Sequence, residues 1–136
     1  MERFITCLLV LLLWLPQVSY AQTPATDVIL DQTHGNYRVV ATIAPNPPTI
    51  GKSTIRIRVT DAQTGAPKPV SAIILLVSAK SVGQPITVIA PQDQANLGKG
   101  IYITERLNFP TSDTWNIIYR ISAPDENFEL NGDVFV

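Results

Sequence analysis

The sequence predicts an all-β fold, an immunoglobulin-like antiparallel β-sandwich of about seven strands. Short segments along the chain alternate apolar and polar residues with a period of two, which is typical of half-buried strands. Glycine, proline, asparagine and aspartate separate these segments at short intervals and predict turns between them. No stretch keeps a helical spacing of apolar residues over three turns, so we expect no long helix.

The beginning of the chain has the pattern of a secretory signal peptide, residues 1–21. Arg3 precedes an apolar run that ends at Leu15, and Ala21 occupies the small-residue position of a cleavage site. This run is much shorter than the roughly 20 residues that a membrane-spanning helix needs. We therefore expect cleavage after Ala21, a single β-sandwich domain over residues 22–136, and an extracytoplasmic location, periplasmic or secreted. The alternative is a membrane anchor formed by an uncleaved N-terminal segment.

Two strands are predicted in the first part of the domain. Residues 28–30 form a short edge strand, and Thr-His-Gly-Asn at residues 33–36 predicts a turn. Residues 37–44 alternate apolar with more polar positions and predict the second strand. A cluster of prolines at residues 45–48 ends it, because proline lacks the backbone N–H of a ladder hydrogen bond.

The centre of the chain predicts a hairpin. Ile55, Ile57 and Val59 alternate with charged or polar residues, so one row faces the core and the other faces water. Residues 61–69 are rich in glycine and proline and reverse the chain. The next strand, residues 70–79, is apolar in both rows, so we expect it to be covered on both faces.

Three further strands follow. Residues 86–90 form a short strand, and residues 92–99 form a loop without periodicity. Residues 100–109 alternate again, with Glu105 out of pattern on the aliphatic row. The next strand, residues 114–122, has the cleanest inward row of the chain, which includes Trp115, Ile117 and Tyr119.

The chain ends in a segment that contains Asn131-Gly132. This dipeptide suits a tight hairpin or a bulge, because both residues tolerate the backbone angles of such turns.

Several short motifs occur in order along residues 36–123. They are Pro-Pro-x-x-Gly at residues 47–51, a strand ending in Asp61, a turn with Gly65 and Pro69-Val70, Ala72 with Ile74, Gly100 with Tyr102, and Trp115 two residues before Ile117. In this set and order the chain resembles the YtkA-like and FixH-like family of extracytoplasmic domains. The resemblance implies an immunoglobulin-like sandwich in which Ala72 and Ile74 face the core. Some relatives accompany copper-handling or cytochrome oxidase assembly systems.

Alternation and resemblance together predict the structural core. Its members are Ile55, Ile57, Val59, Ala72, Ile74, Trp115, Ile117 and Tyr119. If Ala72 and Ile74 face inward, then Ile73, Leu75 and Val77 point outward. Such an exposed aliphatic row is either a face for a protein partner or a surface covered by a neighbouring loop or by the N-terminal lead. These three residues are the candidate interaction face.

The chain has few side chains that could support catalysis or bind a metal. Cys7, Met1 and His34 are its only cysteine, methionine and histidine. Copper(I) prefers thiolate and thioether ligands, and the domain after residue 21 has neither. The family resemblance therefore does not imply that this chain binds copper directly. No nucleophile–base motif is present either, and His34 belongs to a predicted turn. We therefore expect no cofactor, no metal site and no enzyme activity.

Charged residues are scattered along the chain, and the formal net charge is −1. Nucleic acid and anionic membranes are poor partners for such a chain, because both require a basic patch. The aspartates stand singly at predicted turns, where we expect them to cap the turns rather than hold calcium. They are Asp61, Asp93, Asp113, Asp125 and Asp133.

Two functional hypotheses remain. The first is a non-enzymatic secreted or periplasmic interaction module with a protein partner, such as an accessory to a membrane or envelope complex. The alternative is a small metal-binding or metallochaperone domain linked to copper handling or cytochrome oxidase assembly, which is implied by the family resemblance.

Overall fold

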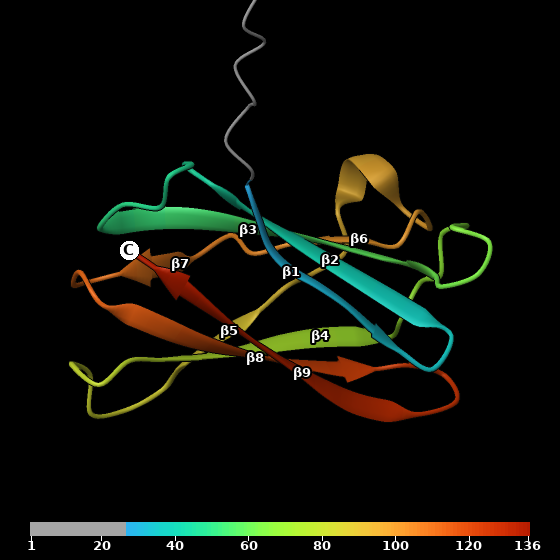
Figure 1. Ribbon diagram of the computed structural model, residues 1–136. Helices are drawn as coiled ribbons and strands as arrows, with labels where there is room; N and C mark the ends of the chain where they lie inside the picture. The colour runs from blue at the N-terminus through green and yellow to red at the C-terminus, as the bar shows by residue number, and fades with distance from the viewer. Residues whose placement is uncertain (1–26) are drawn as a thin grey trace, which may run out of the picture.

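The computed structural model describes residues 27–136, and the predicted signal peptide lies outside them. The described residues form a sandwich of two antiparallel sheets (Figure 1), which confirms the predicted fold class. One sheet has five strands, in the order β1–β2–β3–β6, with β7 also paired to β3. The other has four strands, in the order β5–β4–β8–β9.

The strands account for most of the described chain. The five-stranded sheet consists of β1 (Val28–His34), β2 (Tyr37–Ala44), β3 (Gly51–Asp61), β6 (Ile101–Ile103) and β7 (Leu107–Phe109). The four-stranded sheet consists of β4 (Ala72–Ser78), β5 (Ile86–Ile89), β8 (Thr114–Ser122) and β9 (Asn127–Phe135). A short 3-10 helix, η1 (Gln94–Asn96), lies between β5 and β6. Within residues 27–136, no helix is long and apolar enough to span a membrane.

The hydrophobic core lies between the two sheets. The apolar row of β3 is fully buried, and the inward row of β8 is at most 1% exposed. These rows contain Ile55, Ile57, Val59, Trp115, Ile117 and Tyr119. Burial of two such rows face to face removes a large apolar area from water, which is the main stabilising contribution in a domain without disulfides.

The side-chain orientation predicted for β4 is wrong by one residue. Ile73, Leu75 and Val77 are fully buried, whereas Ala72 is exposed and Ile74 is partly exposed. The candidate interaction face predicted from the sequence therefore lies inside the core. Ala72 and Ile74, which the family resemblance placed in the core, lie on the outer face of the four-stranded sheet.

The inward row of β8 determines this orientation. Leu75 lies opposite Tyr119, and Val77 lies opposite Ile117. Opposite residues of paired strands share a face, so the row of β4 that contains Leu75 must face inward with Tyr119. Both rows of β4 are apolar, and alternation within β4 alone does not distinguish them.

The segment predicted as one strand over residues 100–109 is divided into β6 and β7. Thr104 is buried at the division, where its hydroxyl accepts a 2.8 Å hydrogen bond from the Ile55 N–H. The Thr104 N–H donates in turn to the Ile55 carbonyl at 3.0 Å. Glu105 and Arg106 are left exposed between the two strands. This division explains why Glu105 interrupts the aliphatic row.

The hairpin or bulge predicted at Asn131-Gly132 is not present. β9 passes through both residues as a continuous strand paired with β8, and Gly132 lies opposite Ile117. A Cβ atom on Gly132 would lie 3.1 Å from Leu30 Cδ1 of β1. The glycine therefore lets β1 pack closely against β9, and Gln32 Nε2 donates to the Asn131 carbonyl at 2.8 Å. These contacts join the two sheets along this side of the sandwich.

Candidate functional site

The outer face of the four-stranded sheet carries a cluster of aliphatic side chains, which we call the apolar patch. Its members are Ile74, Leu76, Ile89 and Ile118. Ile74 lies opposite Ile89 of β5, and Leu76 lies opposite Ile118 of β8. Ile89 is 66% exposed and the other three are partly exposed. The patch therefore spans three neighbouring strands, and its centre is the row of β4 that the sequence had placed in the core.

The other half of the same outer face is polar. Arg120 and Glu129 form an ion pair across β8 and β9, with Nε 2.6 Å from Oε1. Asn116 Nδ2 donates to Asp133 Oδ1 at 2.8 Å and also to the Asn131 side chain. These residues have partners within the sheet. The surface therefore changes from apolar at β5 to hydrogen-bonded and charged along β9, apart from the exposed Phe135 at the end of that strand.

β5 ends its sheet, and within the described chain no strand pairs with its outer edge. The Ala90 N–H, just after β5, donates to the Ile73 carbonyl of β4 at 3.0 Å. Backbone groups of an antiparallel strand point alternately to its two sides, so those of Thr87 and Ile89 point to the open edge. An open edge of this kind can accept a further strand.

A hollow of about 380 Å³ lies beside this edge. β5 forms one side of it, and Glu105 and Arg106, between β6 and β7, form the other. Pro85 and Pro91 flank β5, which restricts any added strand to a short window, because proline cannot donate to a ladder. The apolar patch, the open edge and the hollow form one continuous surface.

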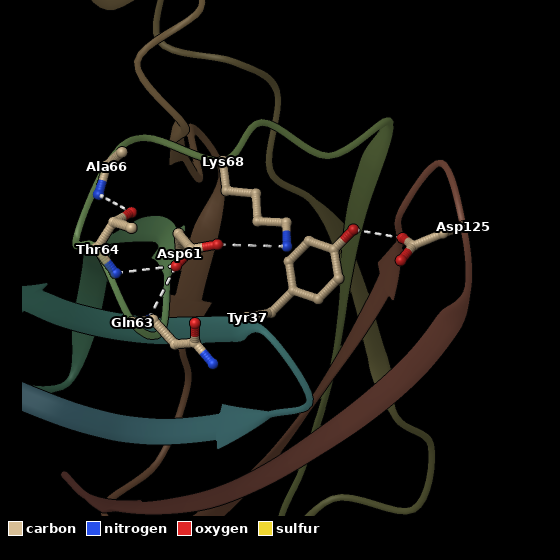
Figure 2. Close-up of polar contacts among 7 residues, drawn as sticks. All are labelled: Tyr37, Asp61, Gln63, Thr64, Ala66, Lys68 and Asp125. Atoms are coloured by element: carbon tan, nitrogen blue, oxygen red, sulfur yellow. Dashed lines mark hydrogen bonds and ion pairs between the residues drawn. The ribbon is translucent and has the colours of Figure 1, made fainter.

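The end of the sandwich around Tyr37 carries a second cluster of polar contacts (Figure 2). Lys68 Nζ lies 4.2 Å from the centre of the Tyr37 ring and 3.7 Å from Asp61 Oδ2. The Tyr37 hydroxyl donates to Asp125 Oδ1. Asp61 Oδ1 accepts from the backbone N–H of Thr64 at 2.9 Å. The cluster therefore joins the loop after β3 to the turn after β8.

These contacts shift the pKa values of the groups involved. The hydrogen bond to Asp125 raises the pKa of Tyr37 to about 12, and the same bond lowers the pKa of Asp125. Backbone N–H groups of Thr64 and Gln63 lower the pKa of Asp61. Every group in the cluster has a partner within it, so we assign it a structural role.

The predicted turn residues can now be placed. His34 is at the end of β1, where its ring stacks on Phe128 with centroids 4.4 Å apart and its Nε2 lies 3.1 Å from Glu126 Oε2. Asp93 accepts from the Ala95 N–H in a turn, and Asp113 accepts from the Thr114 N–H at the start of β8. The turn predicted at Asp133 is wrong, because Asp133 lies within β9 opposite Asn116. Among the described residues, no group of three or more His, Cys, Asp or Glu side chains gathers so as to hold a metal ion.

The fold and the exposed surface define an immunoglobulin-like β-sandwich domain with an apolar patch on one half of an outer sheet face. No protein-family model and no curated protein matches the sequence. The crystal structure of as-isolated FetP from uropathogenic Escherichia coli strain F11, expressed in the periplasm of E. coli, has a TM-score of 0.59 at 9% identity, covering 80% of this chain and 93% of that one. A copper-bound variant of FetP has a TM-score of 0.57 at 8% identity, covering 79% and 89%. At such identities the likeness shows a common fold.

Proposed function

We propose that this chain is a non-enzymatic, extracytoplasmic protein-binding module of the YtkA-like and FixH-like type. The signal-peptide pattern of residues 1–21 supports the compartment. The common fold with FetP, a protein expressed in the periplasm, is consistent with both the compartment and the family resemblance. Binding to another protein, within a membrane or envelope complex, is the activity that we assign.

The observation that carries this proposal is the continuity of the apolar patch with the open edge of β5. Ile89 is 66% exposed at the boundary between them. Complete burial of one such side chain contributes roughly 1.5–3 kcal/mol, so a partner that covers Ile89 together with Ile74 and Leu76 gains substantial binding free energy. Isolated exposed aliphatic residues are ordinary, whereas a cluster across three strands is typical of an interaction site.

The partner that this surface fits is an extended segment of another protein with alternating apolar residues. Its backbone would pair with the outward N–H and carbonyl groups of Thr87 and Ile89, as in β-strand addition. Alternate side chains of the added strand would then continue the apolar patch, because side chains on paired strands share a face.

Site-specific photo-cross-linking in cells tests this proposal. A photoreactive residue replaces Thr87, which is exposed on β5, and in a matched control it replaces Asn127, which is exposed on β9 of the same sheet. We expect a discrete adduct with one other protein from position 87 and none from position 127. Equal labelling from both positions, or an adduct of twice the mass of this chain, would contradict the assigned partner class.

Copper handling is the second candidate function, because one of the two similar FetP structures is copper-bound. The donor set in this chain does not fit such a role. His34 is paired with Glu126, and residues 22–136 contain no cysteine or methionine. Titration of the purified protein with Cu(I) and Cu(II) separates the two functions, since tight stoichiometric binding would support copper handling and contradict our assignment.

A further inference from the structure

The outer face of the five-stranded sheet gathers three arginines that are scattered in the sequence. We call Arg38, Arg56 and Arg58 the arginine face. Arg38 on β2 lies opposite Thr60 on β3, so Arg38 and Arg58 are diagonal neighbours on the paired strands. Arg56 lies two residues before Arg58 on β3. Residues two apart on a strand are about 7 Å apart, and diagonal neighbours on paired strands are about 7–8 Å apart. The three side chains line one shallow hollow of about 440 Å³.

The three guanidinium groups differ in their partners. Arg38 forms a bidentate pair with Asp31, with Nε 3.0 Å from Oδ1 and Nη2 2.8 Å from Oδ2. Neither Arg56 nor Arg58 has an ion pair within 4.0 Å in the described part of the chain. Each guanidinium has five N–H donors in a planar fork that matches a carboxylate or a phosphate. The arginine face therefore has an excess of two positive charges.

Asp93 is the acid whose pKa responds to Arg56. The Asn96 Nδ2 donates to it at 2.6 Å and the Ala95 N–H at 3.1 Å, and these bonds, more than Arg56, lower its pKa. Asp93 therefore caps η1 and leaves Arg56 available to a ligand.

The surroundings of the hollow favour a small ligand. Val40 forms an apolar part of its lining, and the hydroxyl-bearing Thr42 and Thr60 lie on either side. Ile101, opposite Arg58 on β6, is only 6% exposed, and Figure 1 shows the loop with η1 rising over this end of the sheet. The hollow therefore ends at β6. A nucleic acid needs a long basic stripe, and this bounded hollow does not provide one.

We propose that the arginine face binds a small polyanion with two carboxylate or phosphate groups, one held by Arg56 and one by Arg58. Arg38 lies at the rim of the hollow, where Asp31 neutralises its charge. Thr60 supplies a hydroxyl donor beside the anionic groups, whereas the Thr42 hydroxyl donates to the Arg56 carbonyl at 3.5 Å. This site lies on the opposite sheet from the apolar patch, so it is independent of the proposed protein partner.

Calorimetric titration of the purified exported protein with citrate and with pyrophosphate, at ionic strength held constant with sodium chloride, tests the site. The two probes distinguish carboxylate from phosphate ligands. We expect saturable 1:1 binding of at least one probe, weakened at least tenfold in the double variant Arg56→Gln, Arg58→Gln. Arg120→Gln removes the same kind of charge from the other sheet and should leave binding unchanged.

Amide chemical shifts locate the bound anion. Binding should shift the backbone signals of Val40, Thr42 and Thr60 and leave those of β8 unaffected. The double variant Arg56→Lys, Arg58→Lys retains both charges without the planar forks and should bind with intermediate affinity. Absence of saturable binding of both probes, or equal losses in the Arg120→Gln variant, would overturn the proposal.

Discussion

The Tyr37 hydroxyl donates a hydrogen bond to Asp125, which joins the two sheets at one end of the sandwich (Figure 2). Tyr37 begins β2 in the five-stranded sheet, and Asp125 lies in the turn between β8 and β9 of the four-stranded sheet. Tyr37 is 3% exposed, and its ring also packs on Phe128 with centroids 5.3 Å apart. The bond requires a protonated phenol and is strongest when the carboxylate is ionised, so its contribution depends on pH.

We expect the stability difference between the wild type and Tyr37→Phe to be largest near neutral pH. Asp125 has a lowered pKa in the folded state, so its contribution is present above its unfolded pKa of about 3.9 and is lost as the pH falls through the folded value. The raised pKa of Tyr37, about 12, means that its contribution is present below about pH 10 and is lost as the pH rises toward 12. Thermal melts from pH 3 to 11 check this, and a constant difference over that range would contradict the hydrogen bond.

The orientation of β4 predicts opposite outcomes for two adjacent leucines. Leu75 is fully buried, so Leu75→Ala should cost about 2–5 kcal/mol, the range for emptying a core site. Leu76 is partly exposed on the outer face, and Leu76→Ala should cost less than about 1 kcal/mol. Urea denaturation of both variants measures the difference. A larger loss for Leu76→Ala would show that the sequence-based orientation was correct.

Trp115 packs in the core near the start of β8. It is fully buried, its ring lies 5.3 Å from that of Phe109, and its Nε1 donates to the Thr111 carbonyl at 3.1 Å. Trp115→Ala should therefore cost about 3–5 kcal/mol in denaturant melts. A loss below about 1 kcal/mol would place Trp115 at the surface.

Two glycines with the same backbone conformation form a matched pair. Gly98 and Gly100 have φ values of +74° and +70°, so alanine at either position costs about 1–2 kcal/mol of backbone strain. At Gly100 a Cβ would also lie 2.4 Å from the Val59 carbonyl oxygen, whereas at Gly98 it would meet nothing within 4 Å. Gly100→Ala should thus be the more destabilising in thermal melts. Equal losses would show that the contact between β3 and residue 100 relaxes easily.

The sequence predicted the fold class because most strands have one apolar and one polar row. In β3, for example, Ile57 lies between Arg56 and Arg58, and only one orientation buries the isoleucine without burying charge. β4 carries no such contrast, so its orientation depended on pairing with β8, which a single sequence does not reveal. The position of the apolar patch could not be predicted for the same reason.

The arginine face was also not apparent in the sequence. Arg38 and Arg58 are 20 residues apart along the chain and become neighbours through the register of β2 with β3. Arg56 and Arg58 are two residues apart on β3, and this spacing did indicate that they share a face. The third arginine, and the hollow that the three share, depend on strand pairing.

The most direct test of the proposed binding surface is the yield of the cross-linked adduct from a photoreactive residue at position 87. This yield is measured in two variants, Ile89→Lys and Phe135→Lys, and compared between them. Both residues are exposed and apolar, at 66% and 72%, and both lie on the four-stranded sheet. Ile89 belongs to the apolar patch. Phe135 lies outside it, at the end of β9 and opposite Thr114, the first residue of β8. We predict that Ile89→Lys lowers the yield at least tenfold, as loss of roughly 1.5–3 kcal/mol implies, and that Phe135→Lys leaves it unchanged. Equal yields in the two folded variants would contradict a partner bound at β5.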